Sequence, residues 1–395
     1  MFAKSALHII SDKPILFAMV AGESSGDLLG ADLIKSLKNR FPNATFVGIG
    51  GEKMQDEGFK SWYPMEKLSV MGIFEVLKHL PELLKLRKEL IHRLTDAQPD
   101  AFIGIDAPDF NFKVEQRLKE KNIPAIHYVG PSVWAWREKR LVKIKKQVDG
   151  MLVLFPFEEP YYHKYQIPVK FVGHPLANQI SEQNLTKQAR RTLGLAEEGN
   201  ITGLMPGSRW SEVDQMIDLY LQTAVKLQQS FPDMKFLIPC INQKIKSRVE
   251  QSMAKFTVNN IGQKTNFHAV LKQADLVIEA SNQLLVTSGT ATLEVALHGK
   301  PLVLAIKVHP FSYWLMKKLA TTQWIGLPNI LAQQELVPEL IQNEATVVNL
   351  TEKMLEIIEN PYLRNRQIEA FKKQHKMLKQ NASELAAEAI IKWMK

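Results

Sequence analysis

The stretch Ile15-Leu-Phe-Ala-Met-Val-Ala-Gly-Glu-Ser-Ser-Gly-Asp27 has the pattern of a buried strand, a tight turn and the start of a helix. Residues 15–21 are continuously apolar, residues 22–27 are turn formers, and Leu29, Leu33 and Leu37 then recur at helical spacing. A strand that is apolar on both faces and leads into a helix is typical of a parallel sheet covered on both sides. The stretch therefore predicts an α/β fold.

The same pattern recurs in two series along the chain. A polar stretch separates them between about 175 and 200, which predicts two α/β domains, at 1–176 and 177–362, followed by a basic helical segment at 363–395. The expected strands of the first series are 45–49, 101–105, 125–129, 150–155 and 170–172, and those of the second are 201–205, 235–239, 276–279, 284–287 and 301–305.

The composition is that of a soluble globular protein. The 395 residues are 45% hydrophobic and 23% charged, which excludes a disordered tail, a collagen-like chain and a small disulfide scaffold. Cys240 is the single cysteine, so no internal disulfide forms and a reducing compartment is favoured. The apolar run 15–22 is far shorter than the roughly 20 residues of a membrane span and does not resemble a signal peptide. We therefore expect a cytoplasmic protein with at most peripheral membrane contact.

The net charge of +9, from 50 Lys and Arg against 41 Asp and Glu, suggests an anionic partner. Nucleic acid, phosphorylated metabolites and an acidic membrane surface are all compatible with it, and so is a protein that is merely basic. No recognised nucleic-acid-binding module is present, so the charge alone supports that class.

Acidic residues follow two of the expected strands in the first half. Asp106 comes directly after residues 101–105, where it would project from the sheet edge and could take a proton from a hydroxyl nucleophile. Asp109 could instead cap the next helix. Glu23 and Asp27 repel phosphate but suit sugar hydroxyls, with a plain capped turn as the alternative. No histidine or third carboxylate joins Asp106 and Asp109, so no metal site is predicted.

Two turns in the second half suit a nucleotide. Gly207-Ser208-Arg209 places backbone N–H groups and a guanidinium at a helix start, as a diphosphate requires, although an ordinary capped turn has the same pattern. Ser288, Gly289 and Thr290 begin another helix with small residues, and Glu294 follows at a depth suited to a ribose diol. The combination predicts a nucleotide site.

Residues 71–94 form an amphipathic pattern that is interrupted at Pro81 and flanked by lysines and arginines. It predicts either an interfacial element on an anionic membrane or a core helix with a solvated face. Its apolar residues include Ile73, Phe74, Val76, Leu77, Leu80 and Leu84. A basic run from Arg137 to Lys146 follows Trp134 and Trp136 and has the same open alternatives, with nucleic acid added.

Several of these motifs closely resemble lipid A disaccharide synthases. The resembling runs are Val20-Ala-Gly-Glu-Ser-Ser-Gly-Asp27, Ser69-Val-Met-Gly72, Gly104-Ile-Asp-Ala-Pro-Asp-Phe-Asn111, Gly130-Pro-Ser-Val-Trp-Ala-Trp-Arg137, Pro206-Gly-Ser-Arg209, Ser288-Gly-Thr-Ala-Thr-Leu-Glu294 and Leu327-Pro-Asn329. The resemblance implies an inverting glycosyltransferase of the GT-B type. Such a fold has two Rossmann-like domains facing a cleft, the donor nucleotide in the second, and C-terminal helices that pack back on the first.

The resemblance also implies the reaction and its partners. UDP-2,3-diacylglucosamine and 2,3-diacylglucosamine 1-phosphate (lipid X) give UDP and the β(1→6) disaccharide 1-phosphate of lipopolysaccharide synthesis at the inner membrane. The resemblance implies no cofactor and no nucleic acid, and because the family includes dimers a homodimer is one expected assembly. The implied site residues are Asp106 and Arg209 for catalysis; Gly207, Ser208, Arg209, Ser288, Gly289, Thr290, Glu294 and Asn329 for the donor; Glu23, Ser25 and Asp109 for the acceptor; and the apolar residues of 73–84 for membrane and acyl contact.

The chain departs from the family pattern in one segment, and three other functions fit the same sequence features. Residues 279–283 are extra relative to the family pattern, which leaves the role of Asn282 open. A UDP-N-acetylglucosamine 2-epimerase-like isomerase shares the fold but needs no acyl surface. A two-domain solute-binding protein would tolerate loss of Asp106, and a nucleic-acid binder would bind any polyanion with strong salt dependence.

Overall fold

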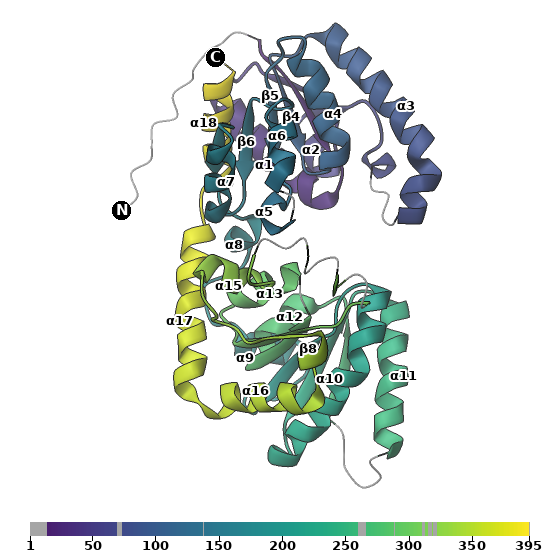
Figure 1. Cartoon of the computed structure of the whole chain (residues 1–395), viewed down its shortest axis with the longest axis vertical. Coiled ribbons are helices and arrows are strands. Elements are labelled where there is room, and N and C mark those ends of the chain that lie inside the picture. Colours follow the sequence, from purple (N-terminus) through teal and green to yellow (C-terminus); the bar gives the residue numbers. More distant parts are fainter. Residues whose placement is uncertain are drawn as a thin grey trace. The chain divides into compact units, whose positions relative to one another are not determined.

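The computed structural model describes residues 14–68, 73–136, 138–259, 266–287, 289–309, 313–314, 318 and 322–394. The chain divides into two compact units (Figure 1). The first contains Met1–Pro175 together with Leu378–Lys395, and the second contains Leu176–Met377. Each unit is built on its own parallel sheet, so the α/β class expected from the sequence is confirmed.

The sheet of the first unit has the strand order β3-β2-β1-β4-β5-β6-β7, and all neighbouring strands are parallel. All residues of β4 are buried because helices cover both faces, which explains its unbroken apolar sequence. Ala21 pairs with Ile105, so the turns after β1 and β4 leave the sheet side by side. The strands are β1 (Leu16–Ala21), β2 (Thr45–Ile49), β3 (Phe59–Ser61), β4 (Ala101–Ile105), β5 (Ala125–Tyr128), β6 (Gly150–Val153) and β7 (Val169–Phe171).

Alternate residues of the strands point to two cores in the first unit. Phe17 and Met19 pack with α1, α2 and α18, whereas Ala18 and Val20 pack with α3 and α4. The helix α3 runs unbroken through Pro81, where the sequence suggested an interruption. The helices are α1 (Ser24–Arg40), α2 (Glu52–Asp56), α3 (Ile73–Ala97), α4 (Pro108–Lys119), α5 (Val133–Trp136), α6 (Leu141–Ile144), α7 (Glu159–Lys164) and α18 (Ala382–Trp393).

The second unit has the strand order β10-β9-β8-β11-β12-β13, again parallel throughout. Its strands are β8 (Ile201–Met205), β9 (Lys235–Cys240), β10 (Phe267–Leu271), β11 (Gln283–Thr287), β12 (Leu302–Ile306) and β13 (Glu339–Ile341). Its helices are α8 (Pro175–Gln179), α9 (Thr186–Thr192), α10 (Trp210–Ser230), α11 (Gln243–Asn259), α12 (Ala274–Ala280), α13 (Thr290–Leu297), α15 (Leu327–Ala332), α16 (Val347–Glu359) and α17 (Pro361–Leu378).

The strand expected at 276–279 is wrong, because these residues lie in the helix α12. A buried helix of two turns is apolar nearly throughout its length, so its sequence looks like that of a buried strand. The preceding strand β10, which pairs with β9, was not expected from the sequence.

The last two helices belong to different units (yellow in Figure 1). Phe371 on α17 is fully buried in a core of the second unit. The return to the first unit therefore begins at Leu378, later than the boundary at 363 expected from the sequence. On α18, Ala386 and Ile390 are fully buried against the core of the first unit, and Arg40 on α1 pairs with Glu384 and with Glu388 at 3.0 Å.

Candidate functional site

A cavity of about 970 Å³ opens in the second unit where β8, β9, β10 and β11 end. Ligands of open parallel sheets bind outside these carboxyl ends, so the location itself is informative. Six of the residues expected to bind the nucleotide donor line this cavity, and one of them, Arg209, is also expected to act in catalysis. It is lined by Met205, Gly207, Ser208, Arg209, Glu212, Pro239, Cys240, Ile241, Lys272, Gln273, Ala274, Asp275, Leu276, Thr287, Gly289, Thr290, Ala291 and Glu294.

The turn after β8 presents the expected phosphate-binding groups, but an acidic side chain already holds them. Glu212 accepts hydrogen bonds through Oε2 from the backbone N–H groups of Ser208 at 3.1 Å and Arg209 at 3.2 Å. Its Oε1 lies 3.1 Å from Nη1 of Arg209, whose side chain is otherwise 80% exposed. Gly207 has φ of +122°, and a Cβ there would lie 2.5 Å from Cβ of Glu212, so only glycine fits.

Glu212 was missed by the sequence analysis. A glutamate at the third position of a helix often accepts a hydrogen bond from the backbone N–H of the residue that precedes the helix. This pattern was the sequence signal that could have identified Glu212. A diphosphate that binds at Ser208 and Arg209 must take the place of the Glu212 carboxylate.

The turn after β11 is open toward the cavity. Gly289 has φ of +128°, and a Cβ built there would have no neighbour within 4 Å, which leaves room for close approach of a ligand to the backbone. The helix α13 begins at Thr290, so its first N–H groups face the same space. Ser288, also expected to bind the donor, lies outside the described residues.

Two carboxyl groups meet in the wall of the cavity. Burial, together with a hydrogen bond to Asp275 and the charge of that residue, raises the pKa of Glu294 to about 7. Glu294 is half-buried on α13 and Asp275 is exposed on α12. Ribose hydroxyls that donate to the Glu294 carboxylate would favour its ionised form and lower this raised pKa, because hydrogen bonds to the charged form stabilise it.

This arrangement predicts a pH-dependent donor affinity. We expect the KM for a UDP-sugar to fall about tenfold between pH 6 and pH 8, as Glu294 becomes ionised across its raised pKa. Both phosphates of a UDP-sugar are diesters, which do not titrate in this range. Asp275→Asn removes the repelling charge but not the burial of Glu294, so it should move the fall in KM to lower pH. A wild-type KM that is constant over this range would contradict the assignment of Glu294 to the diol.

Asn329 is not brought together with the other donor residues. Its side chain is fully buried, and its Oδ1 accepts from the N–H groups of Leu336 and Val337, both at 2.8 Å. Its Nδ2 donates to the Val337 carbonyl and to Oε1 of Glu339, again at 2.8 Å. These four bonds fix the segment between α15 and β13, so the structure gives Asn329 an architectural contact set rather than a place in the cavity wall.

The acidic turns of the first unit lie together at the carboxyl ends of β1 and β4. Asp106 is half-buried directly after β4. A Cβ on Gly22 would lie 3.0 Å from Cβ of Ala107, so the turns touch. Glu23 and Ser25 are exposed at the start of α1. The structure thus brings Asp106 close to the turn that carries the expected acceptor residues, whereas Arg209 belongs to the second unit.

Two other acidic residues of these turns have structural partners. Asp109 carries a 94% exposed side chain whose Oδ1 lies 2.7 Å from Nη2 of Arg140. Asp27 is buried, and its carboxylate accepts from the backbone N–H groups of Gly51 at 2.8 Å, Lys53 at 3.0 Å and Met54 at 3.2 Å. Asp27 therefore caps α2, and the suggestion that it serves sugar hydroxyls is not supported by this contact set.

The amphipathic segment forms the helix α3. Leu80 and Leu84 are 40% and 45% exposed, which is unusual for large apolar side chains on a helix that buries Leu86 and Leu90. Residues 69–72 and the side chains of Ile73, Phe74, Val76 and Leu77 lie outside the described part of the structure. None of the helices in the described part is long and apolar enough to cross a bilayer.

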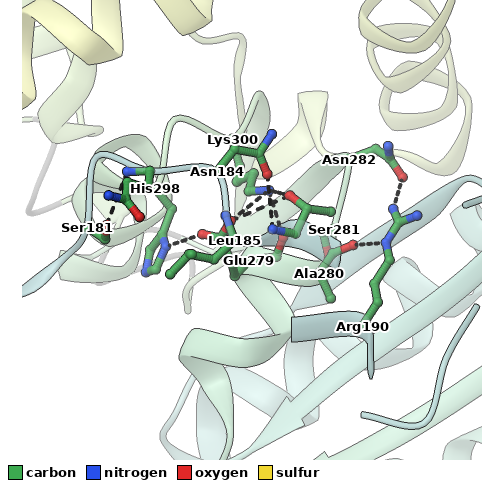
Figure 2. A network of polar contacts seen from close by, with 12 residues as sticks. Ser181, Asn184, Leu185, Arg190, Glu279, Ala280, Ser281, Asn282, His298 and Lys300 are labelled. Atoms are coloured by element: carbon green, nitrogen blue, oxygen red, sulfur yellow. Dashed lines mark hydrogen bonds and ion pairs between the residues drawn. The ribbon is translucent and has the colours of Figure 1, made fainter. Parts of the chain in front are cut away.

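Residues 279–283, which were expected from the sequence to be extra, belong to a network of polar contacts (Figure 2). Asn282 accepts through Oδ1 from Nη2 of Arg190 and from the N–H of Ile201, both at 2.8 Å. The Glu279 carboxylate accepts from the N–H of Leu185 at 2.9 Å and lies 2.9 Å from Nδ1 of His298. Burial opposes its charge, but His298 and Lys300 hold the pKa of Glu279 below its usual value.

This network borders a second cavity of about 620 Å³, with Arg190 and Lys300 in its wall. Both cations are already engaged: Arg190 donates to the carbonyls of Ala280, Glu197 and Gly199, and Nζ of Lys300 donates to Thr186 and to the Glu279 carbonyl. Across the described ranges, no cluster of three or more His, Cys, Asp or Glu residues is arranged to hold a metal ion.

Solved structures at low sequence identity share the fold. UDP-GlcNAc 2-epimerase from Neisseria meningitidis, bound to UDP-GlcNAc, matches with a TM-score of 0.61 and 14% identity over 96% of this chain and 100% of that chain. MurG from Acinetobacter baumannii matches with a TM-score of 0.55 and 13% identity over the same shares of the two chains. The fold is that of the GT-B glycosyltransferases.

Sequence comparison goes further. The family model for lipid-A-disaccharide synthetase matches residues 17–390. A lipid-A-disaccharide synthase of Hydrogenovibrio crunogenus is 62% identical over 377 residues, which are 95% of this chain and 99% of that protein. One of Pectobacterium carotovorum is 42% identical over 386 residues, or 98% and 100% of the two chains. The chain therefore belongs to the lipid-A-disaccharide synthase family of UDP-sugar glycosyltransferases with the GT-B fold.

Proposed function

We propose that the protein transfers the sugar of UDP-2,3-diacylglucosamine to the 6-hydroxyl of 2,3-diacylglucosamine 1-phosphate, with release of UDP. Membership of the family supports the disaccharide-forming step, and the substrates are proposed from it. The observation that carries the donor half is the cavity of the second unit, in which N–H groups and the Arg209 guanidinium for a diphosphate share one space with the Glu294 carboxyl.

The proposed chemistry is a single displacement that inverts the anomeric centre. The acceptor oxygen attacks the anomeric carbon from the face opposite UDP, and the Asp106 carboxylate takes the hydroxyl proton as the new bond forms. The bond from the anomeric carbon to the diphosphate oxygen breaks, and Arg209 and the N–H of Ser208 stabilise the charge on UDP. Glu212 must release these donors for the diphosphate to reach them.

The test is a two-substrate assay of the purified protein. Incubation with the diacylated UDP donor and the monosaccharide 1-phosphate should yield UDP and disaccharide in equal amounts, measured by chromatography and mass spectrometry. A second reaction with UDP-N-acetylglucosamine alone tests for an isomerase. Epimerised UDP-sugar without disaccharide would overturn the proposal.

We also propose that the exposed apolar face of α3 contacts an anionic membrane at which both lipid substrates reside. Leu80 and Leu84 are exposed, and Lys85 on the same helix has a 79% exposed side chain. Apolar side chains flanked by cations bind such surfaces.

We expect the protein to cosediment with vesicles that contain phosphatidylglycerol, and the Leu80→Ser/Leu84→Ser variant to bind them more weakly. Equal binding by the variant would contradict the membrane contact. The homodimer stays a prediction.

A further inference from the structure

The turn that carries Asp106 has an unfavourable backbone conformation. Asp106 has φ of +54° and Ala107 has φ of +42°, so two successive residues with side chains occupy the left-handed region. This region is disfavoured for residues that have a Cβ, and consecutive examples persist only where the surroundings hold them. The question is which contacts hold this turn.

The side chain of Asn111, one turn into α4, makes those contacts. Asn111 is fully buried, and its Nδ2 donates to the Asp106 carbonyl at 2.8 Å and to the Val20 carbonyl at 3.3 Å. One amide group therefore links the turn that follows β4 to the neighbouring strand β1. The N–H of Asp106, in the preceding peptide group, donates to the Tyr128 carbonyl at 2.8 Å.

The contact set of Asn111 is poor for stability alone. Its nearby partners are all carbonyl oxygens, and within the described residues its own Oδ1 has no hydrogen-bond partner. A buried acceptor without a partner is costly, so a residue selected for stability would satisfy both ends of its amide. The arrangement favours fixing the Asp106 carbonyl at the expense of Oδ1.

A buried pair holds Asn111 in place from below. One turn further along α4, Oε1 of Glu115 lies 2.7 Å from Nδ1 of His127 on β5, and both side chains are fully buried. Gly104 pairs with His127 in the sheet, and a Cβ on it would lie 2.2 Å from Oε1 of Glu115 and 2.9 Å from Cβ of Asn111. The helix α4 therefore packs directly against β4, and this close packing brings the Asn111 amide within hydrogen-bond distance of the turn.

We propose that Asn111 is a positioning residue for the reaction: its amide locks the left-handed turn at Asp106 and Ala107, and so aims the Asp106 carboxylate at the acceptor hydroxyl. This inference rests on the proposed role of Asp106 as the base. Asn111 acts through the backbone of Asp106, and it is not among the residues that line the donor cavity of the second unit.

The experiment is a double-mutant cycle with Asn111→Ala and Asp106→Asn in the full chain. In Asn111→Ala we expect kcat to fall about 10- to 100-fold, as a displaced catalytic group predicts. UDP affinity, measured by calorimetry, should stay within about twofold of the wild type, because the donor site is intact. In the Asp106→Asn background, the same substitution should have little further effect on kcat, because the group it aims is already gone.

Gln367→Ala is the matched control. Gln367 is a buried amide on α17 that bonds the N–H and carbonyl of Leu302, so its loss should lower thermal stability without lowering kcat. Asn111→Ser serves if the alanine variant does not fold. Full kcat in either folded Asn111 variant, or equal losses in both backgrounds, would overturn the positioning role. Full activity in Asp106→Asn would instead overturn the assignment of the base.

Discussion

Replacing Asp106 by asparagine should lower kcat by about 10²- to 10⁴-fold, because the amide keeps the shape of the carboxylate but cannot accept the proton of the acceptor hydroxyl. The KM for the donor should change little, since the donor cavity lies in the other unit. The measurement is steady-state formation of UDP with both substrates varied. Calorimetric titration with UDP confirms that the variant still binds nucleotide.

Asp56→Asn is the control for this loss, because Asp56 is an exposed aspartate on α2 of the same unit and has no place in the proposed mechanism. It should turn over at the wild-type rate. If Asp106→Asn also turned over at that rate, the base would have to be sought among the other carboxylates of the two acidic turns, with Glu23 the nearest in the chain to the Gly22 contact.

Replacing Arg209 by alanine should lower kcat about 10²- to 10³-fold, the loss found when one donor to a developing negative charge is removed. UDP affinity should weaken as well, because the guanidinium also meets the bound diphosphate. Arg209→Lys should recover only part of the activity, since an ammonium cannot reproduce two parallel bonds. Both quantities come from the same assay and from titration with UDP.

Arg191→Ala is the matched control for Arg209. Arg191 has a 64% exposed side chain in a surface ion pair with Glu197, at 3.2 Å, and does not line the donor cavity. Its loss should leave turnover unchanged. An Arg209→Ala variant with normal kcat and normal UDP affinity would show that the cavity does not receive the diphosphate at this turn.

Sequence alone located most of the sheet because a covered parallel strand is apolar on every residue. It failed for α12, whose seven residues are too few to show a helical period. It also left out the edge strands β3, β10 and β13; β3 and β13 have three residues each, which carry too little pattern. Pro81 looked like a break, yet α3 continues through it.

The positions of the candidate residues were predictable where turns follow strands directly, as at Asp106, Gly207 and Gly289. It was not predictable where partners come from distant segments. Asp275 and Glu294 meet only because α12 and α13 flank the same cavity, and burial together with that contact raises the pKa of Glu294. The contacts of Asn329 with Val337 and Glu339 likewise depend on how the chain returns to β13.

The position of α18 has a consequence for how the protein is made. The first unit lacks one wall of its core until α18 has been synthesised, because Ala386 and Ile390 cover α1 and Trp393 fills the space above Gly150. When the ribosome has synthesised the second unit, the helix α18 that completes the core of the first unit has therefore not yet been made. Translation that stops before α18 would leave an exposed apolar strip on α1, so complete folding of the first unit waits for a segment that is made after the whole second unit.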